Sequence, residues 1–210
     1  MISAREALLR LRAGNARFSQ NRSELNGAST AAKRFSLTSG QRPIAILLGC
    51  SDSRVPAELI FDQGLGDLFV IRVAGNIVAP SLIGSVEFAA ARFGTQLVVV
   101  LGHSQCGAVE ATLEELLDLT GHHSPNLRSI VDRIAPSVEP LLKETSDREI
   151  LLEKAVRSNV RASVNQLRHG SQILEELQST RNLVIVGAEY SLETGVVDFL
   201  EGVPAEWNAT

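Results

Sequence analysis

Four short apolar runs without polar alternation constrain the fold of this chain more than any other feature. They occupy residues 44–48, 68–71, 97–101 and 183–186. Such runs are typical of strands that are buried on both faces in a parallel sheet. Because right-handed crossovers join parallel strands, the pattern predicts an α/β fold with a mainly parallel central β-sheet flanked by helices. Residues 195–200 could add a further strand at one edge.

Helical signals separate these runs. One helix is expected to open at Pro80, and another is expected to start near Cys106. A long helical stretch covers residues 126–178, and we expect it to be interrupted at Pro136, Pro140 and Gly170.

An N-terminal helix and a polar arm precede this body. Ser3 followed by Glu6 forms a capping box, and apolar residues recur behind it at helical spacing, namely Leu8, Leu9, Leu11, Ala16 and Phe18. Residues 20–42 are polar, which indicates a surface connection. We therefore expect a single domain, with residues 1–42 as helix and arm and residues 43–210 as the α/β body. An amphipathic helix needs a surface for its apolar face, so we expect the helix and arm to reach across to a second copy.

Composition argues against two classes of partner. The net charge of −4 and a pI near 5.6 disfavour nucleic acid, because neutralising phosphates needs clustered Lys and Arg. No apolar run approaches the length of a membrane span, and residues 1–20 lack the apolar core of a signal peptide. We expect a cytoplasmic protein without a membrane partner. A disulfide between the two cysteines, Cys50 and Cys106, is then not expected, and the thiols need another explanation.

The residues that follow two of the apolar runs suggest that explanation. Gly49-Cys50-Ser51-Asp52-Ser53-Arg54 follows the first, and Gly102-His103-Ser104-Gln105-Cys106-Gly107 follows the third. If the two strands are neighbours, Cys50, His103 and Cys106 converge at one end of the sheet. Two thiolates and an imidazole form a zinc site, and three protein ligands are typical of a catalytic zinc with an open position for water. The other histidines, His122, His123 and His169, lie away from strand ends.

Asp52 and Arg54 lie in the loop just after Cys50. Taken alone, they could be an ordinary loop ion pair. Beside a zinc ligand, a carboxylate held by a guanidinium can orient the hydroxide that zinc generates from its bound water. The same carboxylate could also bind the metal, so Asp52 is a possible fourth ligand in a closed state.

The strings Cys50-Ser51-Asp52-Ser53-Arg54 and His103-Ser104-Gln105-Cys106-Gly107 resemble the paired signatures of the β-class carbonic anhydrases. The resemblance extends from Gly14-Asn15-Ala16-Arg17-Phe18 through Gln41-Arg42-Pro43 to Gly187-Ala188-Glu189-Tyr190. It implies an enzyme that uses Zn²⁺ to interconvert carbon dioxide and bicarbonate, by attack of zinc-bound hydroxide. Cys50, His103 and Cys106 would be the ligands, and Asp52 with Arg54 the catalytic dyad.

The resemblance also implies a small substrate pocket lined by Gln41, Phe69, Ala74, Phe88 and Gly107. Gln41 would hydrogen-bond bicarbonate and Phe69 would supply an apolar wall. Ala74 and Phe88 depart from the larger aliphatic residue and the tyrosine found in some members. A homodimer or a dimer of dimers is implied, with residues such as Gln41 and Phe69 contributed across the interface.

Within the family that the chain resembles, one subgroup is inhibited by bicarbonate bound to a Trp, Arg and Tyr set. Arg72 and Tyr190 stand at the corresponding places, but Leu47 replaces the tryptophan. We therefore do not expect bicarbonate regulation.

Two alternative functions remain. The same site could hydrolyse carbonyl sulfide or carbon disulfide, which are linear molecules like carbon dioxide. A closed site completed by Asp52 could instead serve as a non-enzymatic zinc or thiol sensor. Dinucleotide binding is disfavoured, because no strand is followed by Gly-x-Gly-x-x-Gly.

Overall fold

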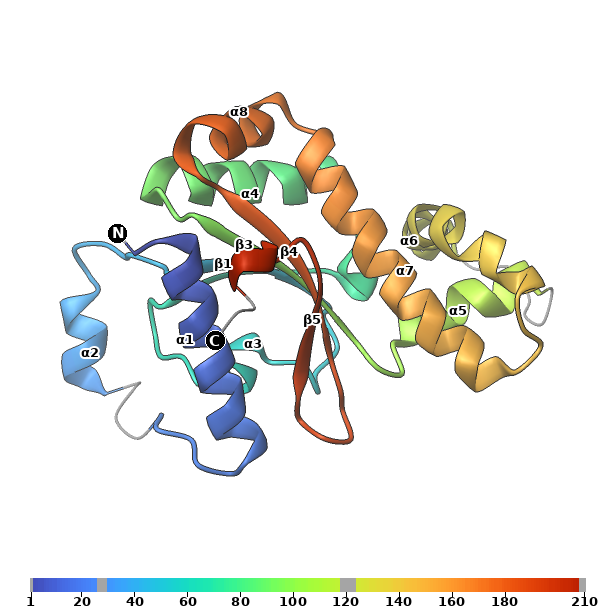
Figure 1. The fold of residues 1–210 in the computed structure, drawn as a ribbon, viewed down its shortest axis with the longest axis horizontal. Coiled ribbons are helices and arrows are strands. Elements are labelled where there is room, and N and C mark those ends of the chain that lie inside the picture. Colours follow the sequence, from blue (N-terminus) through green and yellow to red (C-terminus); the bar gives the residue numbers. More distant parts are fainter. Residues whose placement is uncertain (1, 26–29, 118–123, 208–210) are drawn as a thin grey trace.

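A five-stranded sheet forms the centre of the protein in a computed structural model, which describes residues 2–25, 30–117 and 124–207. The strands are β1 (Ala45–Gly49), β2 (Leu68–Arg72), β3 (Leu97–His103), β4 (Val184–Tyr190) and β5 (Val197–Glu201). Their order is β2-β1-β3-β4-β5, in which β1 to β4 run parallel and β5 is antiparallel to β4 (Figure 1). The predicted fold class and the edge strand are confirmed. Since β1 and β3 are neighbours, the residues after them meet at one end of the sheet.

Helices cover both faces of this sheet. The helices are α1 (Ala4–Ser19), α2 (Ala31–Ser36), α3 (Ala57–Ile60), α4 (Pro80–Phe93), α5 (Gly107–Leu116), α6 (Pro125–Val138), α7 (Arg148–His169) and α8 (Gln172–Arg181). The helices α1 and α3 pack on one face, and α4, α7 and α8 pack on the other (Figure 1). A third core cluster lies where α5, α6 and the first half of α7 meet, and it contains Cys50 and Cys106. The strand-end thiols are therefore enclosed by helices.

The first helix begins as the sequence predicts, because the Ser3 side chain accepts a hydrogen bond from the Glu6 backbone N–H at 3.2 Å. Its apolar face is already buried within the same chain, however. Ala7, Leu8 and Leu11 are at most 1% exposed, against the sheet and α3 of the same chain. The expectation that α1 needs a second copy to bury this face was wrong. The reason is that α1 approaches its own body closely, since a Cβ on Gly14 would lie 1.8 Å from the carbonyl oxygen of Phe61.

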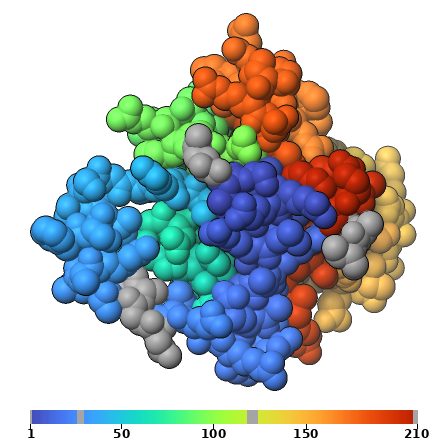
Figure 2. Space-filling model, turned by 60° about the vertical axis from the view of Figure 1, so that its left-hand side comes forward, coloured from blue at the N-terminus to red at the C-terminus, as the bar shows by residue number. Residues whose placement is uncertain are grey.

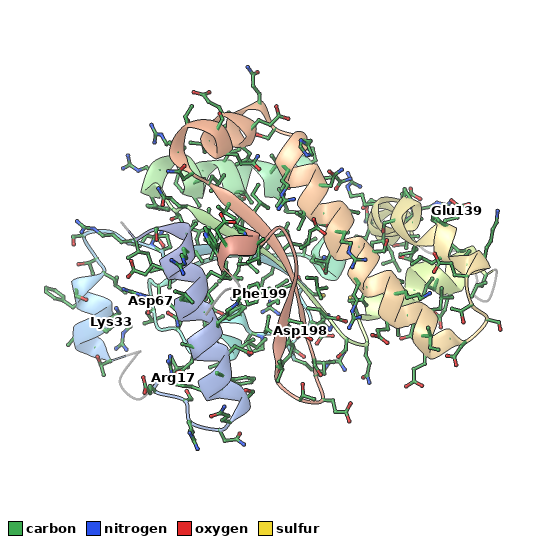
Figure 3. All side chains as sticks on the ribbon, viewed as in Figure 1. Arg17, Lys33, Asp67, Glu139, Asp198 and Phe199 are labelled. Carbon is green, nitrogen blue, oxygen red and sulfur yellow. The ribbon has the colours of Figure 1, made fainter. Side chains whose placement is uncertain are left out.

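The polar segment after α1 is not entirely irregular, because it contains the six-residue α2. A buried carboxylate ties its first part to the body: Asp62 accepts hydrogen bonds from Arg17, Ser23 and the Glu24 backbone N–H. Lys33 of α2 lies 3.9 Å from Asp67, and Figure 3 labels both. Figure 2 shows α2 in light blue to the left of the dark-blue α1, with teal residues of the body between them.

The expected interruptions of the long helical stretch are partly confirmed. Gly170 caps the end of α7, and Pro140 lies in a 3₁₀ helix (Glu139–Lys143). Pro136 does not interrupt α6, which continues to Val138. The helix ends two residues later, so the proline lies in its last turn.

Within the described residues, every helix is too short or too polar to span a lipid bilayer. The single-domain organisation stays a prediction.

Candidate metal centre

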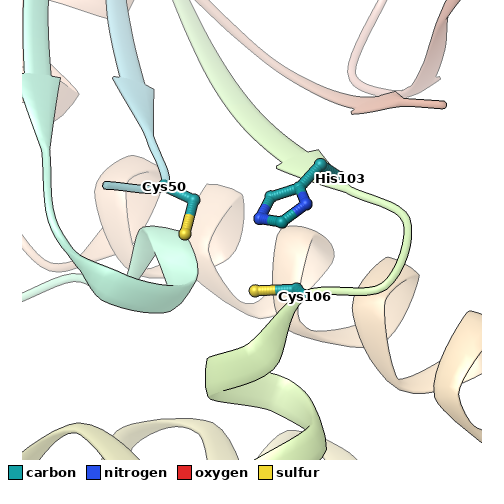
Figure 4. Close-up of side chains that lie close together, drawn as sticks. All are labelled: Cys50, His103 and Cys106. Atoms are coloured by element: carbon teal, nitrogen blue, oxygen red, sulfur yellow. The ribbon is translucent and has the colours of Figure 1, made fainter. Parts of the chain in front are cut away.

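Cys50, His103 and Cys106 point toward one another at the carboxyl end of the sheet (Figure 4). Cys50 directly follows β1, His103 ends β3, and Cys106 is the N-cap residue of α5. Their ligand atoms all lie within 4.8 Å of one another, and each side chain is at most 4% exposed. Register explains the convergence, since Gly49 of β1 pairs with Leu101 of β3. The predicted cluster is thus assembled within one chain.

The ring of His103 is oriented for binding a cation. Its Nδ1 lies 2.9 Å from the carbonyl oxygen of Ser104, so this nitrogen carries the proton and donates it. The opposite nitrogen, Nε2, is buried without a hydrogen-bond partner among the described residues. A buried polar atom without a partner is unfavourable, and a metal ion facing it would remove that cost. The hydrogen bond to Ser104 is therefore the kind that fixes a metal-ligating histidine.

The two thiols are free, and each shifts the pKa of the other. A hydrogen bond from the Cys106 thiol is the largest of the causes that lower the pKa of Cys50 to about 4. The same bond, followed by burial, raises the pKa of Cys106. Backbone N–H groups of Asp52 and Gly75 donate to Cys50 Sγ at 3.5 and 3.3 Å. These donors stabilise a thiolate, which is the form that binds a metal.

Asp52 and Arg54 form a two-pronged ion pair beside this cluster. Arg54 Nε lies 3.0 Å from Asp52 Oδ1, and Arg54 Nη2 lies 2.7 Å from Asp52 Oδ2. The hydrogen bonds from Arg54 hold the pKa of Asp52 well below its usual range. Asp52 Oδ2 is 4.0 Å from His103 Nε2, and Arg54 also donates to the carbonyl oxygen of Gln105. The carboxylate therefore stays ionised next to the atom that would face a metal.

A second arginine holds the same loop, which the sequence reasoning missed. Arg72 Nε donates to the carbonyl oxygen of Cys50 at 2.9 Å, and its Nη2 donates to that of Asp52 at 2.6 Å. The sequence connected Arg72 only with Tyr190 and Leu47, as part of a bicarbonate site. Leu47 is fully buried in the sheet, and the Tyr190 ring lies 6.4 Å from that of Phe18. The sequence signal that could have identified this role of Arg72 is the position of a cationic residue at the end of the strand next to β1.

The predicted pocket residues divide into two groups. Ala74 lies next to Gly75 in a 3₁₀ turn (Ala74–Asn76), and Gly107 follows Cys106, so both flank the cluster. Gln41, Phe69 and Phe88 lie elsewhere. Gln41 precedes β1, whereas Cys50 follows it, and five strand residues span about 16 Å. Within one chain the structure does not bring these three residues to the metal cluster.

These three residues lie at the β2 edge of the sheet together with Phe93 and Leu65. We call the surface formed by Gln41, Leu65, Phe69, Phe88 and Phe93 the aromatic edge. The ring of Phe69 lies 6.2 Å from that of Phe88 and 6.0 Å from that of Phe93. Gln41 and Leu65 join Phe93 in lining a shallow groove beside these rings. Phe88 is 55% exposed and Leu65 is 42% exposed. A large part of the aromatic edge therefore faces outward.

Of the remaining histidines, His169 is exposed at the end of α7, away from the cluster. His122 and His123 lie outside the described residues.

Comparison with known proteins agrees with this geometry. The family model described as carbonic anhydrase matches residues 45–197. Carbonic anhydrase 2 of Mycobacterium tuberculosis is 39% identical over 88% of this chain and 87% of its own length. Carbonic anhydrase of Mycolicibacterium smegmatis is 40% identical, over 90% and 89% of the two chains. A tetrameric β-carbonic anhydrase from Sordaria macrospora has a similar fold, with a TM-score of 0.73 at 24% identity, covering 90% of this chain and 93% of its own.

Proposed function

Since this chain belongs to the β-class carbonic anhydrase family and is a carbonic anhydrase, which hydrates carbon dioxide, we propose that Asp52 and Arg54 are its catalytic dyad. The observation that carries this proposal is the position of the Asp52 carboxylate. Its Oδ2 lies 4.0 Å from the unpartnered Nε2 of His103, while Arg54 holds both of its oxygens. Asp52 lies beside the group that could hold a metal and is not a member of it, because that group consists of Cys50, His103 and Cys106 in the described residues.

The cluster of Cys50, His103 and Cys106 fits zinc. Two sulfur ligands and one imidazole nitrogen suit this metal, and three protein ligands leave a position for water. When bound, zinc supplies an acidified water that can attack an electrophilic carbon. Free thiols at both cysteines also suit the reducing cytoplasm, which we propose as the location.

In this proposal Asp52 acts as a hydrogen-bond acceptor. Because its pKa is held low by Arg54, the carboxylate remains ionised and has no proton to donate. It can accept a hydrogen bond from the reacting water and so direct the water's free lone pair toward carbon dioxide. Arg54 also opposes the closed state, because Asp52 would have to leave both guanidinium hydrogen bonds to become a fourth ligand.

We place the other half of the substrate pocket on a second copy of the chain, in a homodimer or a dimer of dimers. Gln41, Phe69 and Phe88 would then complete the centre of the partner. The support is the aromatic edge itself: β2 has a neighbouring strand on one side only, and Phe88 beside it is more than half exposed. Exposed strand edges with apolar residues are typically covered by another surface.

The charge of the arm is complementary to that of the body. Residues 1–42 carry eight basic and two acidic side chains, whereas residues 43–210 carry twelve basic and twenty-two acidic ones. Within one chain this complementarity already pairs Arg17 with Asp62 and Lys33 with Asp67, so the support for a second copy is the aromatic edge. The Sordaria macrospora protein of similar fold is tetrameric.

The test of the reaction is stopped-flow carbon dioxide hydration at alkaline pH, measured together with bound zinc and with hydrogen sulfide release from carbonyl sulfide and carbon disulfide. We expect hydration in proportion to zinc and little sulfide release. Sulfide release faster than hydration would favour the hydrolase alternative. Cobalt-substituted protein tests the sensor alternative, because the spectrum of a site with exchangeable water changes with pH and that of a site closed by Asp52 does not.

A further inference from the structure

The turn after β2 touches the metal cluster through its backbone. Gly75 N–H donates to Cys50 Sγ at 3.3 Å, and among the described residues it is one of two backbone donors on that sulfur. Gly75 has φ of 68° and Asn76 has φ of 43°, so two successive residues lie in the left-handed region. This region is uncommon for residues other than glycine, although asparagine adopts it more readily than most, so contacts around the turn help to hold it.

Two side chains of α7 hold the turn. Asn159 Nδ2 donates to the carbonyl oxygen of Gly75 at 2.8 Å, and Ser163 Oγ donates to that of Asn76 at 3.1 Å. Both side chains are 2% exposed. They lie four residues apart and so share one face of the helix. Asn159 thus binds the carbonyl of the same residue whose N–H reaches Cys50.

Close packing of α7 on the sheet brings these side chains to the turn. A Cβ on Gly102 of β3 would lie 2.4 Å from a methyl group of Val160, and a Cβ on Gly187 of β4 would lie 2.8 Å from the other methyl group. Glycine at both strand positions therefore allows α7 to lie closer than side chains would permit. On another side, a Cβ on Gly75 would meet Ile134 of α6 at 2.8 Å, so the turn has no room to shift that way.

We propose that Asn159, supported by Ser163, is a positioning residue for the metal centre that keeps the Gly75 N–H on Cys50 Sγ. The inference rests on the zinc site of the proposed function. A hydrogen bond to a sulfur ligand stabilises its thiolate form and fixes its direction, so the loss of this support should weaken metal binding. Neither Asn159 nor Ser163 belongs to the ligand set or to the dyad.

The test is zinc affinity of Asn159→Ala, measured by competition with a chromophoric chelator. Loss of a group that supports a metal ligand typically weakens affinity by about 10- to 100-fold, and we expect a loss in that range. The sulfur-to-metal charge-transfer band of the cobalt-substituted protein should move to lower energy, because the thiolate loses a hydrogen bond. Ser158→Ala is the matched control, since Ser158 on the same helix donates to the carbonyl oxygen of Ser137 at 2.6 Å and does not reach the turn.

Wild-type affinity and an unmoved band in Asn159→Ala would overturn the proposal, and so would equal losses in Asn159→Ala and Ser158→Ala. If Asn159→Ala does not fold, Ser163→Ala decides by the same readouts, with a smaller loss expected and wild-type behaviour counting against the proposal. Failure of the wild-type protein to bind zinc or cobalt would instead contradict the metal site of the proposed function.

Discussion

The metal end of the sheet and the aromatic edge differ in what surrounds them. Cys50, His103 and Cys106 are buried among α5, α6 and α7, and the loop that carries Asp52 is held by two arginines. The aromatic edge has rings packed on one another but largely open on the outside. One chain therefore brings the three metal-binding side chains together, and in the proposed dimer the aromatic edge lies opposite the metal centre of a second copy. Substitutions of the metal-binding side chains should therefore remove zinc, whereas substitutions at the aromatic edge should disrupt assembly and leave zinc bound.

The largest effect is expected at the metal end. Cys106→Ala should abolish both zinc binding and carbon dioxide hydration, because two remaining ligands cannot hold the ion well. Metal analysis and stopped-flow hydration measure the two losses. His169→Ala, an exposed histidine on α7, should keep both. A Cys106→Ala protein with stoichiometric zinc would show that the cluster is not the metal site.

Asp52→Asn should separate chemistry from metal binding. Zinc should remain near one per chain, and turnover should fall by about 10- to 100-fold, because the amide presents a donor as well as an acceptor and weakens the pair with Arg54. Asp67→Asn is the control, since this carboxylate lies near Lys33 of α2 and away from the metal cluster. Unchanged turnover in Asp52→Asn would remove Asp52 from the dyad.

Phe88→Asp should disrupt the interface that we propose at the aromatic edge and leave zinc binding unchanged. A charge placed in an interface costs more than about 1.4 kcal/mol, which is tenfold in association, so we expect dissociation, at least about tenfold lower activity at assay concentration and retained zinc. Sedimentation at that concentration measures the assembly. Ile173→Asp, on the exposed side of α8, should leave assembly and activity unchanged. A fully active Phe88→Asp monomer is the result that this account does not allow.

The smallest effect is expected for Phe88→Tyr, which gives this position the residue that some family members carry. A half-exposed ring that gains a hydroxyl changes stability by roughly 0.5 kcal/mol or less, and we expect activity within about twofold of the wild type. Steady-state hydration kinetics provide the check. A change above tenfold would mean that the ring lies closer to the reacting atoms than an edge position implies.

Most of the fold and the metal cluster could be predicted from the sequence, because both follow from local patterns. Unalternated apolar runs mark strands, and residues just after two of them carry sulfur and imidazole. Parallel neighbours then bring Cys50, His103 and Cys106 together. The short α2 was not predicted, since the polar residues around it give no apolar periodicity. The burial of α1 on its own chain depends on how closely Gly14 approaches Phe61, which no local pattern reveals.

The groups that support the site were also missed, for a similar reason. Arg72 Nε and Asn159 Nδ2 donate to backbone carbonyl oxygens of residues distant in sequence, at 2.9 and 2.8 Å. Every residue type has a backbone carbonyl, so the sequence does not indicate which carbonyl accepts such a hydrogen bond. The separation of Gln41 and Phe69 from the metal cluster within one chain could not be predicted either. Family resemblance placed Gln41, Phe69 and Phe88 in a pocket, but only the register of β1 and β2 puts Gln41 and Phe69 near the opposite end from Cys50.

Subunit mixing tests most directly the claim that the site is shared between two copies. Cys106→Ala lacks the metal but keeps the aromatic edge, and the double variant Gln41→Ala/Phe69→Ala keeps the metal but lacks half of the pocket. The two are refolded together, and carbon dioxide hydration is compared with that of each refolded alone. We predict up to about a quarter of wild-type activity in the mixture, because half of the dimers are mixed and each of these has one intact site. Activity that never exceeds the sum of the two separate proteins would contradict the account.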